Sequence, residues 1–131
     1  MVSLRDDFRA SPQNTWVAQG DTAVLECEPP RGNPEPKVLW KRNGNLIDVK
    51  ANGRYRIVGQ GSLSISQVRQ SDEGRYVCLA KNIVSTRQSN TALLRVTGTF
   101  YNGRLLLIKN VIFIAKNIYS IIIIVVAKTS E

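Results

Sequence analysis

The sequence predicts an all-β fold, an antiparallel β-sandwich, from three observations. Before residue 98, short segments alternate apolar and polar side chains with a period of two, which is typical of strands with one buried face. Turn-forming pairs such as Asn43-Gly44 and Asn52-Gly53 separate these segments. Helical periodicity is absent from the same region. With 131 residues, the chain is long enough for one domain with a hydrophobic core and too short for two comfortable ones.

Six segments carry the alternation, and five of them have a clear inward set. In chain order, the sets predicted to face the core are Ala23, Leu25 and Cys27 in 22–27, Val38 and Trp40 in 37–40, Tyr55 and Ile57 in 54–58, Leu63 and Ile65 in 62–66, and Tyr76, Cys78 and Ala80 in 74–80. The segment 92–96 closes the series. Between 28 and 36, several prolines and Gly32 predict a stiff corner between two strands.

The two cysteines make the fold prediction more specific. Trp40 follows Cys27 by thirteen residues on the next strand, and Tyr76 lies two residues before Cys78. This is the arrangement of an immunoglobulin domain, in which an intersheet disulfide packs against a buried indole and a tyrosine ties a strand to its preceding turn. We therefore predict an immunoglobulin-like (I-set) sandwich over 1–97, with 1–11 as interdomain linker and start of the first strand. Its expected core includes Leu25, Trp40, Leu63, Ile65 and Tyr76.

A Cys27–Cys78 disulfide would place the domain in the secretory pathway or at the cell surface, because thiols stay reduced in the cytosol. The alternative is an intracellular, muscle-type immunoglobulin domain in which the same cysteines remain reduced.

The composition argues against an enzyme. The chain has no histidine, which removes histidine acid–base catalysis and most zinc sites. Two cysteines are too few for a four-cysteine metal centre, and neither a P-loop nor a GxGxxG motif occurs. We predict no catalytic residues, no metal and no cofactor.

The net charge of +8 favours a polyanionic partner, although surface charge can also serve solubility alone. A nucleic acid is the weaker candidate, because the sequence shows no recognition helix, zinc finger or platform of exposed aromatic residues. With a disulfide-bearing fold, an extracellular acidic polysaccharide is the better one.

Three segments carry a closer resemblance to a known family. They are LRDDFR (4–9), VAQGDTAVLECEPPRGNPEPKVLWKRNG (17–44) and SDEGRYVCLAKNIVSTRQS (71–89). These segments resemble the second immunoglobulin domain of the Roundabout receptors, which are axon-guidance receptors that bind Slit. The resemblance extends from Leu4 to about Val96, and the proline spacing of the corner is more particular than the general immunoglobulin pattern.

The resemblance implies an extracellular recognition module of a single-pass cell-surface receptor. The implied partners are Slit, heparan sulfate and neighbouring immunoglobulin domains. In that family most of the Slit contact belongs to the first domain, so this chain is expected to contribute less to it. The alternative function is structural, as an adhesion or spacer module of another cell-surface protein with no ligand of its own.

Side chains that alternate with the inward ones should point away from the core, and on the sheet that contains Trp40 and Cys78 they predict a candidate ligand face. Basic and apolar side chains of three strands should share its outer side, where they could hold sulfate groups or a protein partner. A solvated sheet face, or one covered by a neighbouring domain, is the alternative. With one residue at the tip of the corner, the candidates are Arg31, Lys37, Leu39, Lys41, Arg75, Leu79, Lys81 and Arg95.

Arg54 matches an arginine that, in many related domains, pairs with an aspartate at the position of Asp72. The resemblance therefore implies a structural ion pair between these two residues rather than a ligand site.

Residues 98–131 do not fit the family, and three interpretations remain open. The stretch 105–127 is long enough to span a membrane, but polar residues interrupt it. On a helix these polar residues would share one side, which predicts an interfacial membrane contact. The second interpretation is an aberrant or alternatively spliced end, because residues with AT-rich codons dominate. The third is an extension of the last strand.

Overall fold

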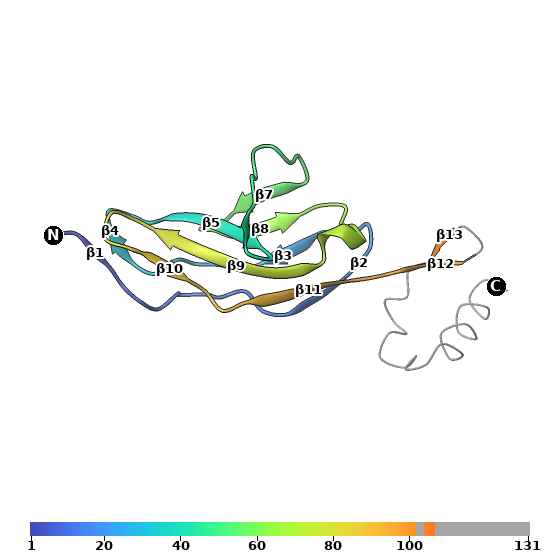
Figure 1. The fold of residues 1–131 in the computed structure, drawn as a ribbon, viewed down its shortest axis with the longest axis horizontal. Coiled ribbons are helices and arrows are strands. Elements are labelled where there is room, and N and C mark those ends of the chain that lie inside the picture. The colour runs from blue at the N-terminus through green and yellow to red at the C-terminus, as the bar shows by residue number, and fades with distance from the viewer. Residues whose placement is uncertain (102–103, 107–131) are drawn as a thin grey trace.

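The structure is a computed structural model that describes residues 1–101 and 104–106 (Figure 1). Its elements are β1 (Ser3–Leu4), β2 (Thr15–Ala18), β3 (Ala23–Leu25), β4 (Gly32–Asn33), β5 (Lys37–Arg42), β6 (Asn45–Leu46), β7 (Tyr55–Val58), β8 (Ser62–Ile65), the 3-10 turn η1 (Gln70–Asp72), β9 (Gly74–Lys81), β10 (Thr86–Gln88), β11 (Ala92–Thr97), β12 (Thr99–Tyr101) and β13 (Arg104–Leu106).

Two main sheets form the body of the domain. The larger has the order β2-β11-β9-β5-β6, with β10 on the continuation of β9, and the smaller has the order β3-β8-β7. Every neighbouring pair within them is antiparallel except β2 and β11, which run parallel. The all-β sandwich predicted from the alternation is therefore confirmed.

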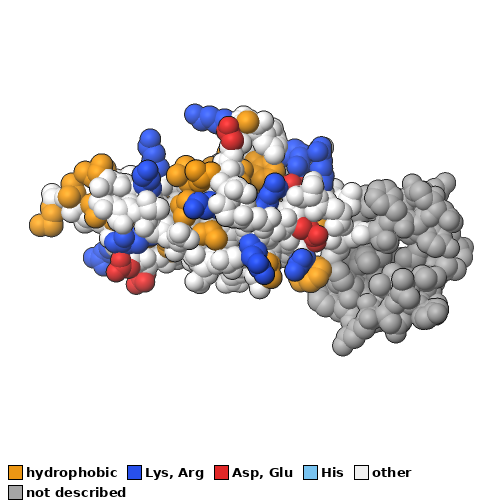
Figure 2. Space-filling view, in the orientation of Figure 1, with side chains coloured by type: hydrophobic (Ala, Val, Ile, Leu, Met, Phe, Trp, Pro, Cys, Tyr) orange, Lys and Arg blue, Asp and Glu red, His pale blue; other side chains and the backbone are white. Residues whose placement is uncertain are grey.

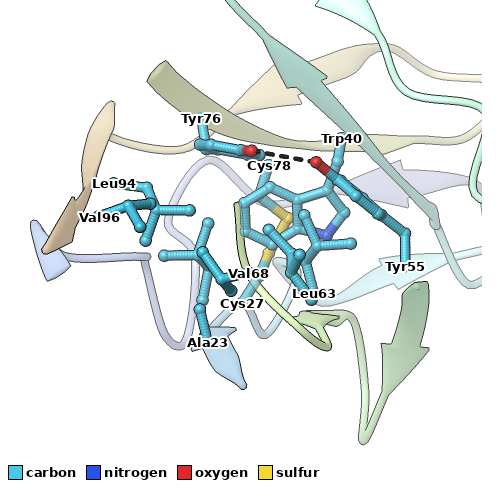
Figure 3. Packing of buried hydrophobic residues seen from close by; sticks show 12 residues of the cluster. Ala23, Cys27, Trp40, Tyr55, Leu63, Val68, Tyr76, Cys78, Leu94 and Val96 are labelled. Carbon is cyan, nitrogen blue, oxygen red and sulfur yellow. Dashed lines mark hydrogen bonds between the residues drawn. A yellow bond between two sulfur atoms is a disulfide. The ribbon is translucent and has the colours of Figure 1, made fainter. Parts of the chain in front are cut away.

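A disulfide joins the two layers. Cys27, two residues after β3, is bonded to Cys78 in β9 across 51 residues of sequence, and both residues are fully buried. The indole of Trp40 lies in the same buried cluster (Figure 3). Its Nε1 donates a hydrogen bond of 2.9 Å to the carbonyl of Gly61. Because the indole nitrogen is satisfied, the largest side chain of the core has no unpaired polar atom. The predicted intersheet bridge is confirmed.

Along β3, β8 and most of β9, the alternate side chains that were predicted to face the core are buried. The predicted core residues Leu25, Trp40, Leu63, Ile65 and Tyr76 are all at most 1% exposed. The Tyr76 hydroxyl donates a 2.5 Å hydrogen bond to the Asp72 carbonyl in the turn before its strand. This bond ties β9 to η1 in the manner of a tyrosine corner.

Ile57 is a correction to the parity prediction. It was expected to be buried beside Tyr55, but its side chain is 42% exposed. Ile57 lies on β7, the edge strand of the smaller sheet, and lines a hollow with Leu39 and Ile47. The side chain stays accessible because this edge of the sandwich is open.

The N-terminal segment packs on the corner that follows the first cysteine. Ser3 and Leu4 pair with Asn33 and Gly32, so that β1 and β4 form a separate two-stranded sheet. The Asn82 side chain donates to the carbonyls of Ser3 at 2.8 Å and Pro34 at 3.0 Å. The start of the chain, the corner and the β9–β10 hairpin are thus held together at one end of the domain (Figure 1).

The predicted tail starts as a hairpin of β12 and β13 in the described residues. Residues 105 and 106 lie in β13, whereas the rest of the predicted membrane-contacting stretch, 107–127, falls outside the described residues. Within 1–101 and 104–106 there is no helix long and apolar enough to cross a membrane. The domain boundary at residue 97 stays a prediction.

Candidate functional site

The outer face of the larger sheet brings most of the predicted ligand residues into rows. Figure 2 shows Lys and Arg side chains interspersed with hydrophobic ones on the face in view. Directly opposite side chains on neighbouring strands have Cβ atoms about 4.5–5.5 Å apart. The register of β5 against β9 sets Lys37 opposite Lys81, Leu39 opposite Leu79, and Lys41 opposite Val77.

The Lys37–Lys81 pair is the most basic point of this part of the face. Both side chains are exposed, and neither forms an ion pair within the described residues. Like charges placed directly opposite each other on a sheet repel. An anion bound between the two ammonium groups would remove this repulsion, so the pair favours a sulfate or carboxylate ligand.

Beside these lysines lies a largely apolar hollow of about 480 Å³, lined by Pro34, Leu39 and Ile83 and also by the acidic residue Glu35, which forms no ion pair with the lysines in the described residues. Ile83 is 76% exposed at the tip of the β9–β10 hairpin. Asn82 fixes this hairpin, because its Oδ1 accepts hydrogen bonds from the amides of Val84 at 2.8 Å and Ser85 at 3.4 Å. The apolar side chain is therefore presented on a loop that is held by side-chain hydrogen bonds.

A second basic group lies at the other end of the same sheet. Arg75 on β9 is opposite Leu93 on β11, and Arg95 is opposite Trp16 on β2. The Trp16 side chain is 59% exposed. Trp16 is not among the predicted ligand residues, because Thr15–Ala18 carries apolar residues on both faces and its partner, β11, is almost 80 residues away in the sequence. An exposed indole beside an arginine extends the candidate face to the sheet edge.

Leu79 and Arg31 depart from the predicted face. Leu79 was expected to be an exposed contact, but it is only 5% exposed. It lies on the central strand β9, between Leu39 on β5 and Gln88 on β10, and these cross-strand neighbours leave it little accessible surface. Arg31 is exposed, but it precedes β4, which pairs with β1, so it does not belong to the rows of the face.

The predicted ion pair, Arg54 with Asp72, forms a bidentate contact. Arg54 donates from its two terminal nitrogens to the carboxylate oxygens of Asp72 at 2.7 and 3.0 Å. The Tyr55 hydroxyl donates at 2.6 Å and the Arg69 amide at 2.8 Å to the same carboxylate. Asp72 is 1% exposed, so four donors surround a fully buried charge.

This environment keeps Asp72 ionised. Burial acts to raise the pKa of the Asp72 carboxyl, but the hydrogen bonds from Arg54, Tyr55 and the Arg69 amide outweigh it and lower the pKa. Burial, together with the hydrogen bond to Asp72, raises the pKa of Tyr55 far above its usual value. The carboxylate is fully occupied by the fold, which leaves no free oxygen for a ligand or a metal. No cluster of acidic or cysteine side chains suited to a metal ion occurs in the described part of the chain.

Comparison with known proteins agrees with this architecture. The family model for the immunoglobulin domain matches residues 7–82. Over 93 residues, 71% of this chain, the sequence is 50% identical to Roundabout homolog 1 of Homo sapiens, and it covers 6% of that relative. It is 43% identical over 96 residues to Protein sax-3 of Caenorhabditis elegans, covering 73% of this chain and 8% of the relative. The chain therefore spans only a small part of these relatives.

Two solved structures have the same fold. The N-terminal Ig1-2 module of the Drosophila receptor protein tyrosine phosphatase DLAR superposes with a TM-score of 0.64 at 31% identity, over 70% of this chain and 45% of that chain. The titin M3 domain superposes with a TM-score of 0.62 at 23% identity, over 72% of this chain and 98% of that one, which shows the fold alone. From the family match, the intersheet disulfide and the buried tryptophan, we conclude that the chain belongs to the immunoglobulin domain family.

Proposed function

We propose that this chain is an extracellular recognition module of a Roundabout-type axon-guidance receptor at the cell surface, and that it binds heparan sulfate through the outer face of its larger sheet. The observation that carries the glycan proposal is the exposed Lys37–Lys81 pair, with no acidic partner in the described residues. The 50% identity to Roundabout homolog 1 supports the receptor class. The immunoglobulin unit is proposed to extend over 1–97.

The arrangement suits an extended polyanion better than a small one. Lys37 and Lys81 lie at one end of the face, Lys41 lies opposite Val77 nearer its middle, and Arg75 and Arg95 lie toward the other end. A sulfated chain that runs along the strands could contact all of them, with lysines acting as point charges and arginines as bidentate donors.

Charge reversal at the lysine pair tests this proposal. We expect the double variant Lys37→Glu with Lys81→Glu to elute from a heparin column at lower salt than the unchanged chain. The slope of log Kd against log salt concentration should fall by about two, roughly one for each cation removed.

The matched control is Lys50→Glu with Arg56→Glu, which has the same net charge but changes a loop and the smaller sheet. If the two double variants elute at the same salt concentration, heparin senses only net charge, and the proposed face is wrong.

Slit binding is the second part of the proposed function. Because most of the contact is expected from a preceding domain, we predict weak binding of this chain alone to the leucine-rich repeats of Slit and stronger binding with heparin present. Surface plasmon resonance with and without heparin measures both. Absence of binding, even with a Roundabout first domain fused to the N-terminus, would support the alternative of a spacer module.

A further inference from the structure

The edge of β5 is open over half of its length. On one side β5 pairs with β9 from Lys37 to Arg42. On the other side it pairs with β6 only at Lys41 and Arg42. One further bond, from the Ile47 amide to the Trp40 carbonyl at 2.9 Å, ends the contact. The first half of β5 therefore has no neighbour on this side.

The register shows which backbone groups this leaves free. In an antiparallel strand, the N–H and C=O of one residue point to the same side, and successive residues alternate. Because the Trp40 carbonyl faces Ile47, the Trp40 amide and both backbone groups of Val38 face the open edge as well. None of these three groups has a hydrogen-bond partner across this edge among the described residues.

The three groups differ in accessibility. Trp40 is 1% exposed, so its amide is closed to an incoming chain, whereas Val38 is only partly buried and presents both an unpaired amide and an unpaired carbonyl. A row of unpaired donors and acceptors on an edge strand is a template for another extended chain.

An apolar hollow of about 280 Å³ adjoins the same edge, lined by Ile47, Val49 and Ile57 in addition to residues of β5. Leu39 and Ile57 at its rim are 40% and 42% exposed. In strand addition, main-chain hydrogen bonds supply affinity and such hollows receive alternate side chains of the added strand.

The charges around the edge select the partner. Lys37 on β5, Lys50 beside the hollow and Arg56 on β7 are exposed. The one acidic residue that lines the hollow, Asp48, accepts a hydrogen bond from the Ala51 amide at 3.2 Å. Two copies of this chain paired edge to edge would bring these cations together, and lysines at sheet edges are a known protection against such pairing. An acidic strand would gain from the same charges.

We propose that the open edge of β5 binds an extended acidic segment of a partner protein as an added β-strand. The backbone of this segment pairs with the amide and carbonyl of Val38, one apolar side chain enters the hollow, and acidic side chains lie near Lys37 and Lys50. This site adjoins the proposed glycan face and shares Lys37 with it, but it differs from that face in its main-chain contacts at the sheet edge.

Amide hydrogen exchange by NMR on the full chain tests the proposal directly. The probe is a capped six-residue peptide of alternating glutamate and valine. We expect saturable binding that slows exchange of the Val38 amide by about tenfold or more, since it gains an acceptor. The same peptide with every backbone amide N-methylated keeps its side chains, but it cannot donate to the Val38 carbonyl and its methyl groups block the close approach of two strands, so it should give no protection.

Charge is tested separately. Lys50→Glu should weaken the Kd for the peptide about fivefold or more, whereas Arg95→Glu, the same charge change on β11, should alter it less than twofold. A peptide with lysine in place of glutamate should not bind.

Three results would overturn the proposal. They are protection that is absent from Val38, equal binding of the N-methylated peptide, and protection that grows with the concentration of the chain alone, which would assign the edge to a second copy. None of them depends on the result of the heparin experiment.

Discussion

Removing the disulfide, by Cys27→Ala together with Cys78→Ala, is expected to lower the free energy of unfolding by about 4 kcal/mol. The bridge closes a loop over a sequence separation of 51, and in the chain-entropy model such a crosslink mainly restricts the unfolded chain. Small domains are stable by only about 5–15 kcal/mol, so this loss is a large fraction of the total. Urea unfolding followed by tryptophan fluorescence measures it, with the change on unfolding expected mainly from the buried Trp40 rather than the exposed Trp16.

The unchanged chain in reductant is the matched control and should lose a similar amount. A loss below about 1 kcal/mol in both experiments would mean that packing around Trp40 is sufficient without the crosslink. That result would favour the intracellular type of immunoglobulin module, in which the cysteines stay reduced, over a secreted one.

The second large effect is expected for Asp72→Asn. Removing the charge leaves the guanidinium of Arg54, only 17% exposed, without its counterion, and it weakens the bonds from Tyr55 and the Arg69 amide. Breaking a buried ion pair on one side costs about 3–5 kcal/mol, and we expect a value near the lower end because Arg54 keeps some contact with water.

The pH dependence of this effect has a definite sign. Because the pKa of Asp72 is lower in the folded state, the stabilisation is fully present above the ordinary carboxyl pKa, about 4, and is lost as the pH falls through the folded-state pKa. The difference between the unchanged chain and Asp72→Asn should therefore shrink in acid. Unfolding curves at pH 7 and in strong acid test this.

Asp6 offers a matched control for Asp72. Its ion pair with Arg87 is also short, 3.0 Å, but the Asp6 side chain is 85% exposed. Asp6→Asn should have no measurable effect on stability, because water screens exposed pairs. Equal effects of the two substitutions would contradict the assignment of the Asp72 network to the stability of the fold.

The alternation of apolar and polar residues along a single strand was enough to predict some of the core. Leu25, Leu63 and Ile65 are buried because a strand with one apolar face turns that face inward, and a run of six or fewer residues shows which face is apolar. The spacing of Cys27, Trp40 and Cys78 adds long-range information, since only two strands in different sheets bring them together.

The candidate site was less predictable, because its surface depends on partners distant in the sequence. Parity assigns Leu79 to the outer face, but only the register against Leu39 and Gln88 shows how little of it remains accessible. Trp16 becomes part of the face through a parallel pairing with β11 that leaves no local signal. The open edge of β5 depends on where β6 stops, which is a property of the turn and loop rather than of β5 itself.

The parallel pairing of β2 and β11 also has a mechanical consequence. The two strands lie near opposite ends of the domain's sequence and run in the same direction, with Thr15 beside Leu94 and Ala18 beside Thr97. A force that pulls the two ends apart would act along these strands and load their hydrogen bonds together in shear, rather than open them one at a time. The domain should therefore resist forced extension better than a pairing in which the bonds open one at a time.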